Sequence, residues 1–145
     1  MKTALVIYNT KKGATKKLAE CISEGLNSKG VEVTIKESEE LASVEDLKNF
    51  DGYVLGSPTY YTEPLEDTAR ILELAAEAEL KGKVGAAFGA YGWSGEAPDI
   101  ISAAMGGRLE MDMLPEPLVV KTPATDDECA RAASYGELIA QKMGA

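Results

Sequence analysis

The sequence contains no histidine and only two cysteines, Cys21 and Cys129, among its 145 residues. The absence of histidine removes the commonest general base, the usual activator of a nucleophilic serine or cysteine, and the commonest zinc ligand. Two cysteines are too few for a disulfide framework or a cysteine-rich metal site. Carboxylates, tyrosines and lysines remain available for acid–base work. We expect no metal and no catalytic side chains, with the chemistry supplied by a cofactor.

Long apolar runs and a signal peptide are also missing, and Met1-Lys2 leads straight into a predicted strand. Basic residues are outnumbered, with 15 Lys and Arg against 24 Asp and Glu and a net charge of -9. Because phosphate backbones require a basic surface, we expect no nucleic-acid partner. An acidic surface suits protein partners with basic docking surfaces, although it equally serves only to keep a protein soluble. We expect a monomer in the reducing cytoplasm, with no membrane association.

Hydrophobic patterning predicts one domain over residues 1–145, in which strands and helices alternate. Strands are predicted at 5–8, 31–35, 53–55, 84–88 and 118–120. The first helix carries Leu18, Ile22 and Leu26 and stops at Gly30. The second is predicted from about Glu63, with Pro64 in its first turn and an inner face of Leu65, Ala69, Leu72 and Ala76. The third spans 97–105. The last opens with the capping pattern Thr125-Asp126-Asp127-Glu128 and has the inner face Cys129, Ala132, Gly136, Ile139 and Met143.

Five strands that alternate with helices predict an α/β fold built on a doubly wound sheet of five parallel strands. The second strand alternates apolar and polar residues, which is typical of a half-buried edge strand. An edge position for this strand favours the order 2-1-3-4-5. That order places a ligand crevice beyond the carboxyl ends of strands one and three.

The loop from Tyr8 to Thr15 joins the first strand to the first helix and is a candidate anion site. Backbone N–H groups at the helix N-terminus suit a phosphate, and the hydroxyls of Thr10 and Thr15 add donors. Gly13 allows the backbone a close approach. Four cations oppose the helix dipole here, each by roughly 0.3–1 kcal/mol: Lys11, Lys12, Lys16 and Lys17. A bound phosphate dianion removes that conflict; the alternative is four solvated lysines in an ordinary turn.

The same loop and its flanks match a longer pattern of aliphatic, aromatic, hydroxyl and small residues. Its specified places are filled by Val6, Ile7, Tyr8, Thr10, Gly13, Thr15, Ala19 and Ile22. This pattern is the flavodoxin signature, and the chain resembles a short-chain flavodoxin over its whole length. The resemblance implies a flavodoxin-like three-layer doubly wound sheet and one bound flavin mononucleotide (FMN).

Two further loops resemble the flavin loops of that family, Gly56 to Tyr60 and Gly89 to Gly95. The resemblance implies cofactor contacts from Thr10, Lys11, Lys12, Gly13, Ala14, Thr15, Ser57, Pro58, Thr59, Tyr60, Tyr61, Gly89, Ala90, Tyr91, Gly92, Trp93, Ser94 and Gly95. Trp93 and Tyr60 are then expected to stack on the two flavin faces; simple packing is the alternative for Trp93. The chain departs from the family at Lys12, Ala14 and Tyr61, where a hydroxyl, Asn and Gly are common.

By this resemblance the chain is a low-potential electron carrier that shuttles electrons between redox enzymes. Acids between positions 63 and 79, against Arg70 alone, would oppose reduction of the flavin. One alternative is an FMN-dependent reductase of the same fold, although short connections favour a carrier over a substrate-transforming enzyme. Another is a stand-alone partner of a di-metal oxidoreductase, since the stretch from Tyr91 to Glu96 is similar to flavodiiron proteins. A receiver-type signalling domain would need an acid where Ser57-Pro58 stands.

Overall fold

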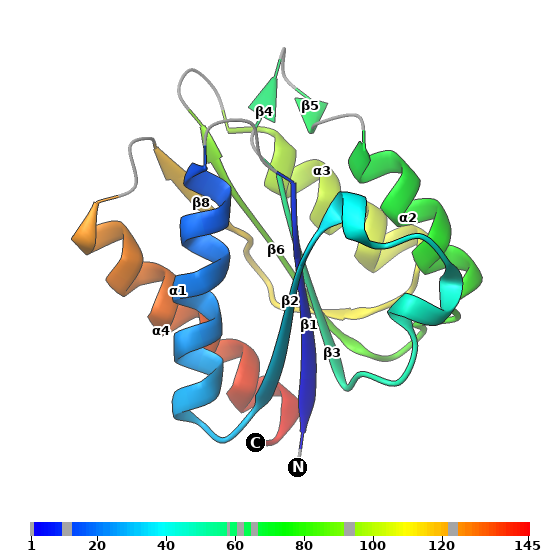
Figure 1. Ribbon diagram of the computed structural model, residues 1–145, viewed down its shortest axis with the longest axis horizontal. Helices are drawn as coiled ribbons and strands as arrows, with labels where there is room; N and C mark the ends of the chain where they lie inside the picture. The colour runs from blue at the N-terminus through cyan, green and yellow to red at the C-terminus, as the bar shows by residue number, and fades with distance from the viewer. Residues whose placement is uncertain are drawn as a thin grey trace.

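The computed structural model describes residues 2–9, 13–57, 59–60, 63–64, 67–91, 95–121 and 125–145, with the backbone alone for 59, 60, 63 and 64 (Figure 1). The strands are β1 (Thr3–Tyr8), β2 (Glu32–Glu37), β3 (Gly52–Gly56), β4 (Thr59–Tyr60), β5 (Glu63–Pro64), β6 (Val84–Tyr91), β7 (Asp112–Met113) and β8 (Leu118–Lys121). The helices are α1 (Ala14–Ser28), α2 (Asp67–Glu77), α3 (Ala97–Ala103) and α4 (Asp126–Met143), with short helical turns η1 (Ser38–Glu40), η2 (Val44–Leu47) and η3 (Ala104–Arg108).

The main sheet is parallel and has the order β2-β1-β3-β6, with β7 and β8 both paired to β6. Helices α1 and α4 cover one face, and α2 and α3 cover the other (Figure 1). This arrangement confirms the predicted three-layer fold and the order 2-1-3-4-5. The fifth strand is divided between β7 and β8, and the segment between them contains Pro115 and Pro117, which have no N–H to donate to a ladder.

The predicted start of the second helix is wrong. Glu63 and Pro64 form strand β5, which pairs antiparallel with β4, and α2 begins only at Asp67. The fixed φ of proline fits an extended strand as well as a first helical turn, so Pro64 alone did not decide between them. The predicted inner face is right in part: Leu72 and Ala76 are half-buried against the core, Ala69 is exposed, and Leu65 lies outside the described residues. The fully buried residues of α2 are Thr68, Ile71 and Ala75.

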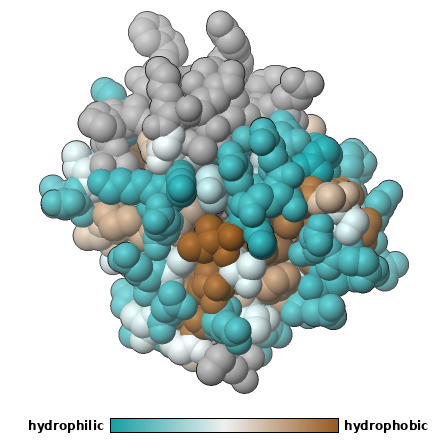
Figure 2. Space-filling view, viewed as in Figure 1, coloured by the Kyte–Doolittle hydropathy of each residue, from teal (hydrophilic) through white to brown (hydrophobic). Residues whose placement is uncertain are grey.

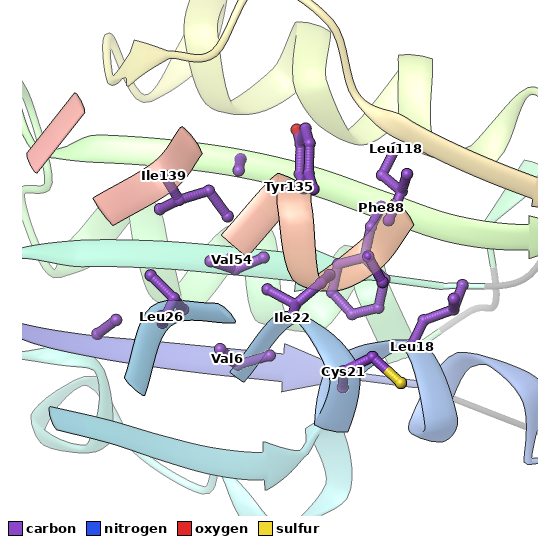
Figure 3. Packing of buried hydrophobic residues seen from close by; sticks show 14 of the residues in the cluster. Val6, Leu18, Cys21, Ile22, Leu26, Val54, Phe88, Leu118, Tyr135 and Ile139 are labelled. Atoms are coloured by element: carbon purple, nitrogen blue, oxygen red, sulfur yellow. The ribbon is translucent and has the colours of Figure 1, made fainter. Parts of the chain in front are cut away.

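The sheet separates two apolar layers. Side chains of β1 alternate between them, so Val6 packs toward α1 and α4 while Leu5 and Ile7 pack toward α2 and α3. Figure 3 shows the first layer, in which helix and sheet residues interdigitate. Every β1 side chain from Ala4 to Tyr8 is buried, as expected of a strand covered on both faces.

Helices α1 and α4 touch through their backbones at two glycines. A Cβ at Gly136 would lie 2.1 Å from the Ile22 carbonyl oxygen, and a Cβ at Gly25 would lie 1.9 Å from the Ala133 carbonyl oxygen. No side chain fits at either place without moving a helix. These glycines therefore set the distance between α1 and α4.

A disulfide joins the same two helices, between Cys21 on α1 and Cys129 in the first turn of α4. The sequence analysis did not anticipate this bond, because two cysteines 108 residues apart carry no pairing signal of their own. Their Cα atoms lie 5.4 Å apart, which places them within bonding range. Closing a loop of this size contributes about 4.7 kcal/mol to stability in the chain-entropy model.

A predicted cap holds the start of α4, and one tyrosine holds its middle. The backbone N–H of Glu128 donates to the Thr125 hydroxyl at 3.4 Å, which confirms the predicted cap. The Tyr135 hydroxyl donates to the Glu116 carbonyl at 2.9 Å and so ties α4 to the segment before β8. No helix in the part of the chain that the structure describes is long and apolar enough to cross a membrane.

We expect Gly136→Ala to lower the free energy of unfolding by roughly 1–3 kcal/mol, because its methyl group would overpack against α1. Alanine favours a helix by about 1 kcal/mol over glycine, so helix propensity alone would make the variant more stable. A loss of stability therefore indicates overpacking against α1. Gly107→Ala is the matched control, since nothing lies within 4 Å of its Cβ position. Urea denaturation measures both variants. A Gly136→Ala protein as stable as the wild type would contradict the close contact.

The stability of the protein should depend on pH partly through Asp51. The backbone N–H of Thr3 donates to the Asp51 carboxylate at 2.8 Å, and this hydrogen bond lowers the pKa of Asp51. Its stabilisation is therefore complete above the unfolded-state pKa of about 3.9 and is lost as the pH falls through the lower folded-state value. We expect Asp51→Asn to show a weaker loss of stability during acid titration below about pH 5.

Glu24→Gln serves as the control for that titration, because Glu24 is exposed in the middle of α1. Urea melts at a series of pH values give the comparison. Identical pH dependence for Asp51→Asn and wild type would show that the Thr3 contact does not contribute to acid stability.

Candidate cofactor site

Three loops begin side by side at the carboxyl edge of the sheet, at the top of Figure 1. Tyr8, Gly56 and Phe88 are in register across β1, β3 and β6. The N–H of Asn9 donates to the Gly56 carbonyl at 2.9 Å, and the N–H of Ser57 donates to the Phe88 carbonyl at 3.2 Å. The backbone itself therefore brings together the starts of the three loops that the sequence predicts for a cofactor.

The N-terminus of α1 is prepared for an anion. Gly13 stands at the cap with φ 86°, in the left-handed region, and no side chain caps the helix. The first turn contains no acidic residue, and Lys16 and Lys17 are exposed beside it. Because N–H groups of a first turn have no acceptor within the helix, they carry partial positive charge toward this edge. A phosphate group fits this charge distribution.

Thr15 adds a donor at the same place. Its side chain is 1% exposed, and its hydroxyl has no hydrogen-bond partner among the described residues. A buried hydroxyl without a hydrogen-bond partner lowers folding stability by about 1–3 kcal/mol. Its presence here is explained if a bound ligand supplies the acceptor. A phosphate oxygen would accept this hydrogen bond. The residues present therefore fit the phosphate group of FMN.

The second and third loops lie in direct backbone contact. A Cβ at Gly89 would lie 2.2 Å from the Ser57 carbonyl oxygen and 2.9 Å from Pro98, so this position has no room for a side chain. A Cβ at Gly95 would lie 2.8 Å from Val119 and 3.2 Å from the Tyr91 ring. Gly95 therefore lies beside Tyr91, the last residue of β6, and beside β8.

The structure describes only part of the predicted site. Gly13, Ala14, Thr15, Ser57, Gly89, Ala90, Tyr91 and Gly95 lie at or near this edge. Thr10, Lys11, Lys12, Pro58, Tyr61, Gly92, Trp93 and Ser94 lie outside the described residues, as do the side chains of Thr59 and Tyr60. Their cofactor contacts stay predictions.

Sequence reasoning did not select Asn9, which is 7% exposed and directly follows β1. The signal that could have found it is its position. The first residue after each central parallel strand belongs to the crevice. Asn9 and Ser57 hold this place after β1 and β3, whereas Gly89 still belongs to β6, which extends to Tyr91.

Two arginines pair with acids of α2: Arg70 near the start of the helix, and Arg108 toward the opposite edge of the sheet, where β7 pairs with the start of β6. Arg70 meets the Asp67 carboxylate at 2.7 Å, and Arg108 meets the Glu73 carboxylate at 2.8 Å. These hydrogen bonds hold the pKa of Asp67 and of Glu73 below the ordinary range. From the sequence, Arg70 is the only basic residue expected to offset the acids between positions 63 and 79. Arg108 lies outside that stretch, so its pairing with Glu73 is not predicted. The negative field of α2 is weaker than its composition suggests.

Arg70 also fixes the start of α2 in space. Its guanidinium donates to the carbonyl oxygens of Leu41 at 2.6 Å and Ser38 at 2.7 Å, which belong to the segment after β2. One side chain therefore links two connections that both leave the carboxyl edge of the sheet. This link positions the segment that enters α2 from the second loop.

Comparisons with known proteins agree with this geometry. The family model described as flavodoxin matches residues 6–132. A type A flavoprotein of Rhodobacter capsulatus is 36% identical over 147 residues, covering 98% of this chain and 33% of that protein. A solved flavodoxin from the domain Archaea superposes with a TM-score of 0.93 at 32% identity and covers 99% of both chains.

A larger solved structure shares the fold. The flavodiiron protein from Giardia intestinalis has a TM-score of 0.90 at 22% identity, covering 99% of this chain and 36% of that one. At this identity the likeness concerns the fold alone. The chain spans about a third of the length of this protein and of the Rhodobacter flavoprotein.

Thr15→Val should separate cofactor binding from stability. We expect FMN to bind at least tenfold more weakly, because one hydrogen bond to a charged group is worth roughly 1.5–3 kcal/mol. Riboflavin, which lacks the phosphate, should bind almost as before. The apoprotein should become more stable by about 1 kcal/mol, since the variant no longer buries an unpaired hydroxyl.

Thr15→Ser is the matched control, because it keeps the hydroxyl and should keep most of the FMN affinity. Titration of the apoprotein with FMN and with riboflavin gives the dissociation constants, and urea melts give stability. Equal losses of affinity for both ligands in Thr15→Val would place Thr15 away from the phosphate.

Proposed function

This chain belongs to the flavodoxin family, and we propose that it carries electrons between redox proteins through one bound FMN. FMN is the cofactor of this family, and the chain binds it. The observation that carries the proposal is the buried Thr15 hydroxyl, without a partner among the described residues, at a helix N-terminus that no side chain caps. It stands at the same sheet edge as the two flavin-loop segments.

FMN supplies the electron-transfer chemistry when it is bound, and the chain's own residues bind and orient it. We assign the phosphate to the N–H groups of Gly13 to Thr15 and to the Thr15 hydroxyl, together with Thr10, Lys11 and Lys12 from the sequence. We assign the flavin ring to the loop that begins at Ser57 and to the end of β6 from Gly89 together with the loop that follows it. Tyr60 and Trp93 supply the aromatic faces in this proposal. The close contact of Gly89 with Ser57 supports this assignment, because it holds the two loops together.

The net negative charge of the chain supports a low reduction potential for the bound FMN and a redox partner with a basic surface. Reduction adds negative charge, and an acid about 8 Å away at an effective dielectric of about 20 opposes it by roughly 2 kcal/mol. The net charge of -9 supplies such acids, although Asp67 and Glu73 are already paired with arginines. We therefore propose a low-potential carrier whose redox partners present basic docking surfaces.

We also propose that the chain acts as a monomer in the cytoplasm. Ile35, Ile100 and Leu138 are the exposed large hydrophobic residues of the described part of the chain, and they lie on three different elements. Figure 2 shows hydrophobic areas on one face bordered by hydrophilic side chains. Scattered apolar residues of this kind are ordinary on a monomer surface.

A second candidate function is that of a stand-alone partner for a di-metal oxidoreductase. The specific observation in its favour is similarity: 98% of this chain aligns with a type A flavoprotein at 36% identity, and the flavodiiron protein from Giardia intestinalis shares its fold. In that case the chain would deliver electrons to one dedicated metalloprotein. The third candidate function is that of an FMN-dependent reductase, which requires a substrate pocket over the flavin.

The purified protein should show the absorption bands of oxidised FMN, with one FMN per chain. The chemically reduced protein should pass electrons to cytochrome c, a basic redox protein, at a rate that falls as salt is added, because screening weakens attraction between unlike charges. NADPH alone should not be oxidised rapidly. Stopped-flow spectroscopy measures each rate.

The outcomes of that experiment separate the candidate functions. Rapid NADPH oxidation by the isolated protein would favour the reductase. A colourless protein that also fails to take up added FMN would overturn the proposal altogether.

A further inference from the structure

The Cys21–Cys129 disulfide lies where it can influence the cofactor end of α1. Cys21 is about two helical turns from the Gly13 cap, and Cys129 is in the first turn of α4. The glycine contacts with α4 follow directly along α1: Ile22, the next residue, meets Gly136, and Gly25, one turn further, meets Ala133. The disulfide is therefore the attachment to α4 nearer the phosphate-binding end of α1.

We propose that Cys21 and Cys129 form a thiol–disulfide exchange site that takes a dithiol reductant and controls how tightly FMN is held. With the bond closed, α1 is fixed on α4 and its first turn keeps the shape that receives the phosphate. With the bond open, the first half of α1 depends on side-chain packing alone. The proposal rests on FMN binding at this helix, as assigned above.

The two sulfurs differ in access. Cys21 is 4% exposed, whereas Cys129 is half-buried in the first turn of α4. A thiolate of the reductant therefore attacks the sulfur of Cys129, and Cys21 leaves as a thiolate that takes up a proton. The second thiol of the reductant then attacks the mixed disulfide and releases Cys129 as a thiol. Two electrons and two protons pass to the protein, and the reductant leaves as a disulfide.

Charge around Cys129 selects among reductants. Asp126, Asp127 and Glu128 precede it in the first turn of α4, and Arg131 pairs with Glu128 at 3.3 Å. This acidic surface disfavours an anionic thiol such as glutathione and favours a neutral dithiol, or a dithiol protein with a basic surface. In the cytoplasm proposed above, such reductants would open the bond.

The disulfide controls FMN affinity through the fraction of apoprotein molecules whose phosphate site has the binding-competent shape. The measured dissociation constant rises in inverse proportion to the fraction of apoprotein whose site has the competent shape. If the open form has this shape about a fifth of the time, FMN binds about fivefold more weakly. The closed bond removes this loss because it holds α1 in place before FMN arrives.

The experiment compares the air-oxidised protein, the protein reduced with dithiothreitol and desalted without oxygen, and the double variant Cys21→Ala/Cys129→Ala. Iodoacetamide labelling with mass spectrometry counts the free thiols, and FMN titration gives the dissociation constant. Thermal unfolding of the apoproteins reports on the disulfide independently of FMN.

We expect no labelled cysteine in the oxidised protein and two after reduction. Reduction should raise the FMN dissociation constant about fivefold and lower the apoprotein Tm. The double variant should resemble the reduced protein and should not respond to dithiothreitol. Glutathione at the same thiol concentration should open the bond more slowly than dithiothreitol.

Three results would overturn the proposal. These are two labelled thiols in the air-oxidised protein, a bond that dithiothreitol leaves closed in the folded protein, or equal FMN dissociation constants in both states even where the Tm falls. Absence of FMN binding in every sample would instead reject the proposed function. The thiol count and the apoprotein Tm keep these two failures distinguishable.

Discussion

The parallel register of β1, β3 and β6 is the constraint on which the cofactor edge depends. Parallel strands all finish at one edge, so the loops that follow them must converge there. Backbone hydrogen bonds extend the register one residue beyond the strands, from Asn9 to Gly56 and from Ser57 to Phe88. The close approach of Gly89 to the Ser57 carbonyl oxygen leaves no room for a side chain at position 89. Among the described residues, backbone contacts thus bring the ends of the three strands together.

The phosphate end of α1 depends on contacts far from it in sequence. Glycines 25 and 136 bring α1 and α4 into backbone contact, and the Cys21–Cys129 bond joins them. Tyr135 in turn ties α4 to the segment before β8, and burial raises the pKa of its hydroxyl, which keeps it a neutral donor. The orientation of the first helix is therefore set by the last helix of the chain.

Several features of the site lower the stability of the apoprotein. Thr15 buries a hydroxyl without a partner among the described residues, α1 begins without a side-chain cap, and lysines stand beside its positive end. Each departs from what a stable isolated helix would contain. A bound phosphate satisfies all three, because it accepts hydrogen bonds and carries two negative charges. Features that destabilise the apoprotein therefore become favourable interactions once FMN is bound.

Predictions from sequence succeeded where local periodicity carried the information. The buried run of the first strand and the Thr125 cap each depend on a few neighbouring residues, and the structure confirms them. The second strand lies at the sheet edge as predicted, but its burial does not alternate, because Ile35 is exposed and Thr34 is half-buried. The start of α2 was wrong because Pro64 suits a strand and a first helical turn equally well. Its inner face is centred on Thr68, Ile71 and Ala75, one residue before the predicted Ala69, Leu72 and Ala76.

The sequence by itself determined the strand order, the family signature around Gly13 and Thr15, and therefore the cofactor. Tertiary structure alone decided that Cys21 meets Cys129, that Arg108 pairs with Glu73, and that two glycines set the α1–α4 distance. These contacts join residues at least 35 positions apart. Local propensity extends over a few residues only, so contacts at such separations exist only once the sheet has brought its flanking helices together.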